Sequence, residues 1–391
     1  MDFVMARSLA FAAALACAAP ALGADRADYV TLRTAELLNL KCAALKYVEH
    51  TYLHEAVITA LDSTDESINL ITGDMSREDY DAWKQGADDE AAQKAAEAGC
   101  TSAANSYLLT ARAKASEDIF RAMLLAFHFN TLPGDDRNHV ALPADQQASA
   151  ERYDGFLQQV YGESYPAFAE AQRQAAAASL PASAMPSAEP EEGALPTFGA
   201  IATIDDQDRI LLAQSAAAKV LQRIEFEVTA ESNGWLVKPL QTQTGAVVPA
   251  LERADGSAPG ILYPVWAGPV AYTSGGAEFR LALARAPEGV IRVMTYGAGA
   301  TSLADASGVR FYVAGTAPYG DPGFRAGASV FEATPSSGPC LGGPCFDLPH
   351  DATVALLDGE GAIAELVMGS GDEPAGQVAL RASELSRVPV R

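Results

Sequence analysis

The chain has 391 residues and a formal net charge of −23, from 27 basic and 50 acidic side chains. With 49% hydrophobic and 20% charged residues, it has enough apolar surface to fold, and at roughly 100–200 residues per domain it predicts two domains or three. The acidic balance argues against binding to nucleic acid, whose phosphates require clustered lysine and arginine, and against docking on anionic lipid.

Residues 1–23 have the features of a secretory signal peptide. Arg7 precedes an apolar run that ends near Pro20, and small residues follow it directly before Ala24. We therefore expect cleavage before Ala24 and export of the mature chain to the periplasm, the cell surface or the medium. The apolar run is too short to span a bilayer, which takes about 20 residues, and no transmembrane segment is predicted in the mature chain.

Four cysteines remain after cleavage, and an even number in an exported chain predicts disulfide bonds. Cys340 and Cys345 flank a short loop that is rich in glycine and proline, so we expect them to pair with each other. Cys42 and Cys100 then pair by elimination, which would tie the middle of one predicted helix to a junction between two others.

The first part of the mature chain, residues 24–173, predicts a helical domain. Four helices are expected, over 29–61, from Ser76 toward Gly99, over 101–128 and over 145–173, the last interrupted near Pro166. Short connections between such helices favour an antiparallel bundle. The tether 174–196 follows, and its prolines, small residues and acidic cluster are typical of an extended linker.

The remaining residues, 197–391, predict a β-rich domain preceded by one helix over 205–223. Alternating apolar and polar residues predict strands over 224–228, 278–283, 309–313, 352–356, 362–366 and 378–381. Asp358-Gly359, between two apolar runs, predicts a hairpin over 357–361. Strands at close spacing without helices between them indicate an antiparallel sandwich or barrel, and hence a mixed α+β chain of two domains.

His50 and His54 are the most suggestive candidates for a metal site. Two histidines four residues apart share a helix face and can bind one divalent metal ion. Thr51 stands where the catalytic glutamate of a zinc protease motif would be, and nothing in the spacing selects His128 or His139 as a third ligand. A polar, partly wet stripe of the helix explains the pair equally well.

Other arrangements give no catalytic prediction. Ser215 and Lys219 are four residues apart on a predicted helix, but alanines surround them and no oxyanion hole is identifiable. His350 and Asp351 are adjacent and would point to opposite faces of a strand. No catalytic residue and no resident cofactor are therefore predicted, with a divalent metal at the histidine pair as the exception.

Aromatic residues are frequent in the β-rich part, where most are expected in the core. Tyr263, Trp266 and Tyr319 belong to the segments Tyr263-Pro-Val-Trp266 and Tyr319-Gly-Asp-Pro322, whose proline and glycine place them on loops or strand edges. Exposed aromatic rings stack on sugars and anchor protein partners, so these three residues are candidates for binding a glycan or an envelope protein.

These observations together predict an exported envelope protein that binds a partner or has a structural role, without catalytic activity. The leader, the paired cysteines and the lack of a convincing catalytic set support this interpretation. The alternative is a hydrolase, metal-dependent or otherwise, whose site is assembled only in three dimensions.

Overall fold

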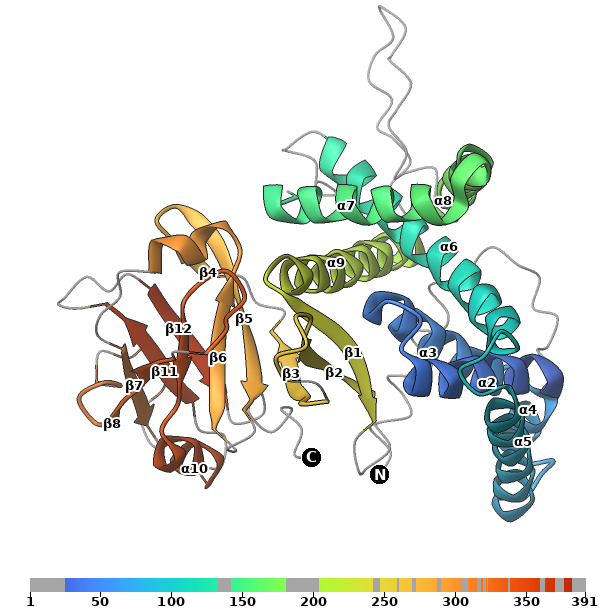
Figure 1. The fold of residues 1–391 in the computed structure, drawn as a ribbon, viewed down its shortest axis with the longest axis horizontal. Coiled ribbons are helices and arrows are strands. Elements are labelled where there is room, and N and C mark those ends of the chain that lie inside the picture. Colours follow the sequence, from blue (N-terminus) through green and yellow to red (C-terminus); the bar gives the residue numbers. More distant parts are fainter. Residues whose placement is uncertain are drawn as a thin grey trace, which may run out of the picture. The chain divides into compact units, whose positions relative to one another are not determined.

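The structure is a computed structural model that describes residues 25–132, 142–180, 204–241, 247–258, 260–268, 272–286, 290–303, 309–314, 318, 321, 323–336, 338–358, 363–369 and 376–381. The predicted signal peptide 1–23 lies outside these residues, as does most of the predicted tether, from residue 181 onward. The chain forms two compact units, Met1–Ile224 and Glu225–Arg391, which are described separately. Its composition is mixed helix and antiparallel sheet, as the sequence predicts (Figure 1).

The described residues of the first unit are helical. Its elements are α2 (Arg26–Cys42), α3 (Tyr47–Asp62), α4 (Asp65–Thr72), α5 (Arg77–Ala98), α6 (Ala104–Thr131), α7 (Ala144–Tyr161), the 3-10 turn η1 (Gly162–Ser164), α8 (Tyr165–Ser179) and the first part of α9 (Ile204–Ser232). Ser76 caps α5 by accepting a hydrogen bond from the Asp79 amide, as predicted. The predicted interruption near Pro166 is confirmed, because η1 separates α7 from α8.

Small side chains allow the helices of this unit to approach closely. Ala87, Ala91, Ala95 and Ala98 form a buried stripe along α5 at helical spacing, and α5 packs against α2. Tyr29, Val30 and Leu38 of α2 and Leu53 and Val57 of α3 belong to the same hydrophobic core. Helix α2 also contacts α3 and α6, so it lies at the centre of these helices.

The prediction of one helix over 29–61 is wrong, because two helices, α2 and α3, cover this range. The break follows Cys42, where Ala43 takes a left-handed conformation with φ of 49° and donates its amide to the Asn39 carbonyl. The Asn39 side chain accepts a hydrogen bond from the Leu45 amide, and the Glu49 side chain accepts one from the Lys46 amide. These side chains satisfy the turn without any glycine or proline.

The second unit contains two antiparallel sheets. The larger has the strand order β1 (Trp235–Gln241), β2 (Val247–Arg253), β3 (Tyr263–Ala267), β5 (Ala277–Arg285), β6 (Ile291–Tyr296), β10 (Cys345–Asp347) and β9 (Thr334–Pro335), with β4 (Tyr272–Ser274) also paired to β5. The smaller has the order β12 (Gly376–Arg381), β11 (Ile363–Met368), β7 (Val309–Ala314) and β8 (Ser329–Glu332). Within the described residues neither sheet closes on itself.

One hydrophobic core joins the two sheets. Alternate residues of β5, namely Phe279, Leu281 and Leu283, share this core with Phe311 of β7 and Leu366 of β11. The 3-10 helix η3 (Ala298–Leu303) and helix α10 (His350–Asp358) contribute further buried residues to it. The Tyr272 hydroxyl also donates a hydrogen bond to the Ala379 carbonyl, which connects β4 to β12.

Four of the predicted strands are confirmed, and two are wrong. The ranges 278–283, 309–313, 362–366 from residue 363 onward, and 378–381 lie in β5, β7, β11 and β12. The range 224–228 is helical and belongs to α9, while 352–356 lies in α10. The hairpin expected over 357–361 is also wrong, because α10 continues through Asp358; residues 359–361 lie outside the described range.

Both wrong strands have a physical explanation. In α9, Glu225 alternates with apolar residues and so resembles an exposed strand position. It is instead buried in an ion pair with Arg280 of β5, at 2.9 Å. In α10, Ala352 and Leu356 are four residues apart and both fully buried, which is helical spacing on one face. Short segments satisfy both periods, and the tertiary environment then decides between them.

Candidate functional site

His50 and His54, the predicted metal pair, lie on the face of α3 that packs against α2. The Nδ1 atom of His54 is 2.5 Å from Glu36 Oε1, and the Nδ1 atom of His50 is 3.0 Å from Asn39 Nδ2. Glu36 and Asn39 are three residues apart on α2, and the two histidines are four apart on α3. The pairs therefore form two hydrogen-bonded rungs, which we call the α2–α3 ladder, and both histidines take part in helix packing.

The carboxylate of the ladder, Glu36, is fully buried and has two basic partners. It pairs with His54 and also with Arg33, one helical turn earlier on α2. Burial by itself would raise the pKa of Glu36, but the hydrogen bond from His54 and the charge of Arg33 outweigh it, so the pKa lies below its usual range. Glu36 is therefore ionised at neutral pH, and it orients His54.

His54 is the solvent-facing member of the ladder, with 43% of its side chain exposed. Its hydrogen bond to Glu36 raises the pKa of the imidazole, against a smaller lowering by burial. Because Nδ1 donates to the carboxylate, the lone pair of the neutral ring is on Nε2, which can accept a proton or bind a metal ion. A histidine oriented by a carboxylate is a common element of proton-transfer and metal sites, but by itself it defines neither.

His50 is buried, with 1% of its surface exposed, and has a different chemistry. Burial lowers the pKa of His50 to about 4, so the ring is neutral at neutral pH; the Glu36 charge opposes this shift and the His54 charge adds to it. Its Nε2 atom has no hydrogen-bond partner among the described residues. A buried polar atom without a hydrogen-bond partner destabilises the folded state, so Nε2 of His50 lowers the stability of this core.

The predicted disulfide between Cys42 and Cys100 is present, with the two Cα atoms 5.5 Å apart. It anchors the end of α2 directly before the α2–α3 turn. On the α3 side of that turn, buried Glu49 accepts from Arg112 of α6 at 3.2 Å, and Arg112 also donates to the Ala44 carbonyl at 2.5 Å. Burial raises the pKa of Glu49, although the Arg112 charge and the Lys46 amide pull it down.

The metal prediction for His50 and His54 gains no support from this geometry. No group of three histidine, cysteine, aspartate or glutamate side chains in the described part of the chain is arranged to hold a metal ion. His128 lies on α6 in a ring contact with Phe129, and His139 falls outside the described residues. The prediction stays a prediction, and the ladder accounts for the spacing of the pair.

Sequence reasoning missed four members of this polar core, Glu36, Asn39, Glu49 and Arg112. Glu36 and Asn39 are fully buried, but neither is three or four residues from Leu38, so they do not share its helix face. The apolar pattern of α2 therefore gave no signal for their burial. The partners across the helices have no signature in the sequence, because they depend on how α2, α3 and α6 pack.

Two of the three aromatic candidates are in described residues of the second unit. Tyr263 is half-buried and packs edge-to-face against Trp235, with the ring centroids 5.3 Å apart. Trp266, also half-buried, packs on the core between the sheets. Both rings thus have packing roles and a remaining exposed part. Tyr319 lies outside the described residues.

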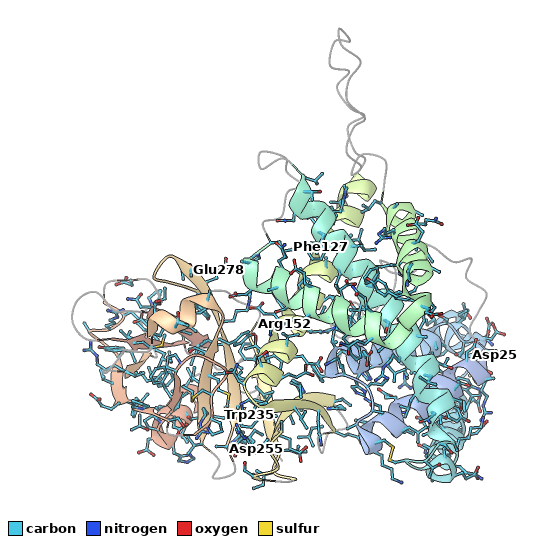
Figure 2. The ribbon with its side chains drawn as sticks, turned by 45° about the horizontal axis from the view of Figure 1, so that its top comes forward. Asp25, Phe127, Arg152, Trp235, Asp255 and Glu278 are labelled. Carbon is cyan, nitrogen blue, oxygen red and sulfur yellow. A yellow bond between two sulfur atoms is a disulfide. The ribbon has the colours of Figure 1, made fainter. Side chains whose placement is uncertain are left out.

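Trp235 is fully buried, at the start of β1, beside the second predicted disulfide. Cys340 and Cys345 are bonded as expected, and the indole Nε1 of Trp235 donates to the Cys340 carbonyl at 3.1 Å. Arg253 lies over the indole ring, 5.1 Å from its centroid, and pairs with Asp255, which Figure 2 shows near Trp235 at this end of β1 and β2. The arrangement is a packed cluster in which Arg253 already occupies the cation position.

The remaining candidates are not brought into a catalytic arrangement. Ser215 and Lys219 lie on the exposed side of α9. Burial, together with the charge of Arg223, lowers the pKa of Lys219. His350 begins α10 and is exposed, as is Asp351. None of the helices in the described residues has both the length and the apolar character needed to cross a bilayer.

Compared with protein-family models, with curated proteins and with solved structures, the chain matches none.

Proposed function

We propose that the chain is an exported protein of the cell envelope that binds an envelope protein or a glycan, or holds one in place, and has no catalytic activity. In this proposal the disulfide-tied helices form an antiparallel bundle, and the two sheets form a sandwich that presents the binding surface. The periplasm, the cell surface and the medium all fit the leader and the disulfides.

The observation that carries the proposal is that the side chains able to perform chemistry make contacts within the fold. His50, His54 and Glu36 connect α2 to α3, while Glu49 and Arg112 connect α3 to α6. In the other unit, Arg280 pairs with Glu225 and Arg292 with Asp347. These charged and polar side chains support packing, which favours a scaffold that presents a surface over an enzyme.

The binding residues we propose are Tyr263 and Trp266 on β3, through the exposed part of each ring. They are three residues apart, so they face opposite sides of the strand, and each ring by itself can stack against a sugar or pack against an aromatic anchor. Tyr319 belongs to the same proposal by sequence alone. Acidity keeps such a protein soluble in an external compartment without attracting polyanions.

The test uses the purified full chain and two probes, glycan sacculi and the soluble and membrane proteins of the envelope. We expect sedimentation with sacculi, or a defined protein adduct after chemical crosslinking, and we expect Tyr263→Ala and Trp266→Ala to weaken it about tenfold. Leu236→Ala is the matched control, because Leu236 is an exposed apolar residue of β1, which β2 separates from β3, with 41% of its surface exposed.

Two outcomes would contradict the proposal. The first is turnover of a generic ester, glycan or peptide substrate by the intact chain, with no binding to either probe. The second is stoichiometric zinc or copper that is lost when His50 and His54 are both changed to alanine. Either outcome would favour the alternative, a hydrolase whose site is assembled in three dimensions.

A further inference from the structure

The hydrogen bonds around Asn39 fix the protonation state of His50. The Leu45 amide can only donate, so the Asn39 atom that it contacts, at 2.8 Å, is the carbonyl oxygen Oδ1. The Asn39 amino group Nδ2 must then face His50 Nδ1, at 3.0 Å, and it can only donate. His50 Nδ1 is therefore an acceptor, which leaves the ring proton on Nε2.

A second proton on His50 is incompatible with this arrangement. Protonated Nδ1 would carry a hydrogen that faces the Asn39 amino group, and two donors cannot bond to each other. If the Asn39 amide turned over to accept from Nδ1, its amino group would face the Leu45 amide and the second hydrogen bond would be lost. In either orientation the α2–α3 turn gives up one of the bonds that Asn39 makes.

The elements packed around His50 set how readily it takes up that proton. The Glu36 carboxylate on α2 favours the charged ring, and His54 on α3 disfavours it. Arg33 on α2 neutralises part of the Glu36 charge and also lies 3.4 Å from Asp88 of α5. Helix α6 contributes Arg112, whose partner Glu49 adjoins His50 in the sequence. Burial is the largest influence and keeps the ring neutral.

The turn that would open is an anchored one. Leu45 is 4% exposed and belongs to the core of the unit, and the Cys42–Cys100 disulfide holds the residue directly before the turn. Loss of an Asn39 bond therefore releases the segment between Ala43 and Lys46, while α2 stays tethered at Cys42. The feature is local and reversible, because no covalent bond changes.

We propose that the α2–α3 turn is an acid-sensitive latch, which is closed by Asn39 while His50 is neutral and opens when His50 is protonated. The proposal is independent of the envelope-binding function. It concerns a conformational change within the helical unit, and binding at β3 can succeed or fail without affecting it.

The test measures hydrogen exchange of the full, disulfide-bonded chain at pH 7 and pH 4, corrected for intrinsic exchange rates, by mass spectrometry of peptides that cover residues 43–49. In the natural chain we expect protection of the turn to fall about fivefold or more at pH 4, the equivalent of one lost hydrogen bond. Peptides from the middle of α5 serve as the internal reference, and they should retain their protection.

Two variants identify the residues responsible. His50→Asn keeps an acceptor near the Nδ1 position and does not titrate, so its turn should stay protected at pH 4. Asn39→Asp should stay protected as well, because a carboxylate accepts both from the Leu45 amide and from protonated His50. The control His54→Asn removes the neighbouring histidine without touching Asn39, and its turn should still open.

The proposal is overturned if the natural turn is equally protected at both pH values, or if Asn39→Asp and His50→Asn open as fully as the natural chain. Should one of the two variants fail to form the Cys42–Cys100 bond, the other decides the matter together with the natural chain.

Discussion

Glu36 has fully buried carboxylate oxygens, but its partners Arg33 and His54 both reach solvent. A charge in this position depends on its partners, since its own hydration is lost on folding. The ladder therefore combines a charged rung at Glu36 and His54 with a neutral rung at Asn39 and His50. The two rungs respond differently to substitution and to pH.

Removing the charged rung should destabilise the helical unit. We expect Glu36→Ala to lower the free energy of unfolding by about 2 kcal/mol, because Arg33 and His54 lose a buried acceptor but can still reach water. The matched control is Glu90→Ala, which removes a partly exposed partner of Arg26 and Lys94 and should cost much less. Urea unfolding followed by circular dichroism measures both, and equal losses would contradict the burial argument.

The neutral rung makes stability depend on pH with a defined sign. The pKa of His50 falls from 6.5 unfolded to about 4 folded, so between these values the unfolded chain binds more protons and stability decreases as the pH falls. The loss is about 3 kcal/mol at most. His54, whose pKa is raised, has the opposite sign, and its contribution changes above pH 6.5, between its unfolded and folded pKa values.

We expect His50→Asn to remove most of the decline in unfolding free energy between pH 6.5 and pH 4. Denaturant titrations at several pH values measure it directly. His54→Asn is the comparison, and it should retain the decline, because the raised pKa of His54 makes stability change above pH 6.5 and not within this interval. A natural chain whose stability does not change across this interval would show that His50 is not held neutral by burial.

At the scale of elements, the two disulfides close loops of very different length. The sequence separation is 58 residues between Cys42 and Cys100 and 5 between Cys340 and Cys345. In the chain-entropy description a longer loop restricts the unfolded state more, which corresponds to about 4 kcal/mol for the first bond and about 2 kcal/mol for the second. The first bond also anchors the α2–α3 turn.

We therefore expect a double change of Cys42 and Cys100 to alanine to cost about twice as much unfolding free energy as the same change at Cys340 and Cys345. Hydrogen exchange of peptides from each unit during urea unfolding assigns each loss to its own unit. The reverse order of the two losses would show that native contacts outweigh loop entropy.

The short disulfide loop is also held by its fit against β6. A Cβ atom on Gly343 would lie 2.4 Å from Thr295 Oγ1 and 2.8 Å from the Thr295 backbone oxygen, which cannot move without breaking the sheet. We expect Gly343→Ala to cost about 2 kcal/mol. In Gly327→Ala the new methyl meets its closest atom at 3.7 Å, so this control should stay within about 0.5 kcal/mol. Thermal unfolding compares the two, and similar melting temperatures would contradict the clash.

Some elements of the fold can be predicted from the sequence and others cannot. Both disulfide pairings, the capped start of α5 at Ser76 and four of the six predicted strands follow from spacing and local chemistry. The break at Ala43 could not be predicted, because a side chain, Asn39, forms the turn where glycine or proline usually does. The strand predicted over 224–228 is wrong for a related reason, because the partner of Glu225, Arg280, is 55 residues away in the sequence.

At the scale of the whole molecule, we assign a different role to each of the two units. In our proposals the helical unit has a polar core that responds to pH, and the other unit binds through aromatic rings on β3. The net charge of −23 suits an external compartment, where it favours solubility and gives no affinity for polyanions. An exported chain also meets the pH of its surroundings directly, which is the condition under which the latch would operate.

The central claim, that this protein binds an envelope component through β3, is tested most directly by crosslinking in the cells that make it. A photoreactive amino acid is placed at position 263 or 266, with position 236 on β1 as the reference. The account predicts a defined adduct with one envelope protein or glycan from positions 263 and 266, and little or none from position 236. It is contradicted if all three positions give the same diffuse adducts or none, while the natural chain is present in the envelope.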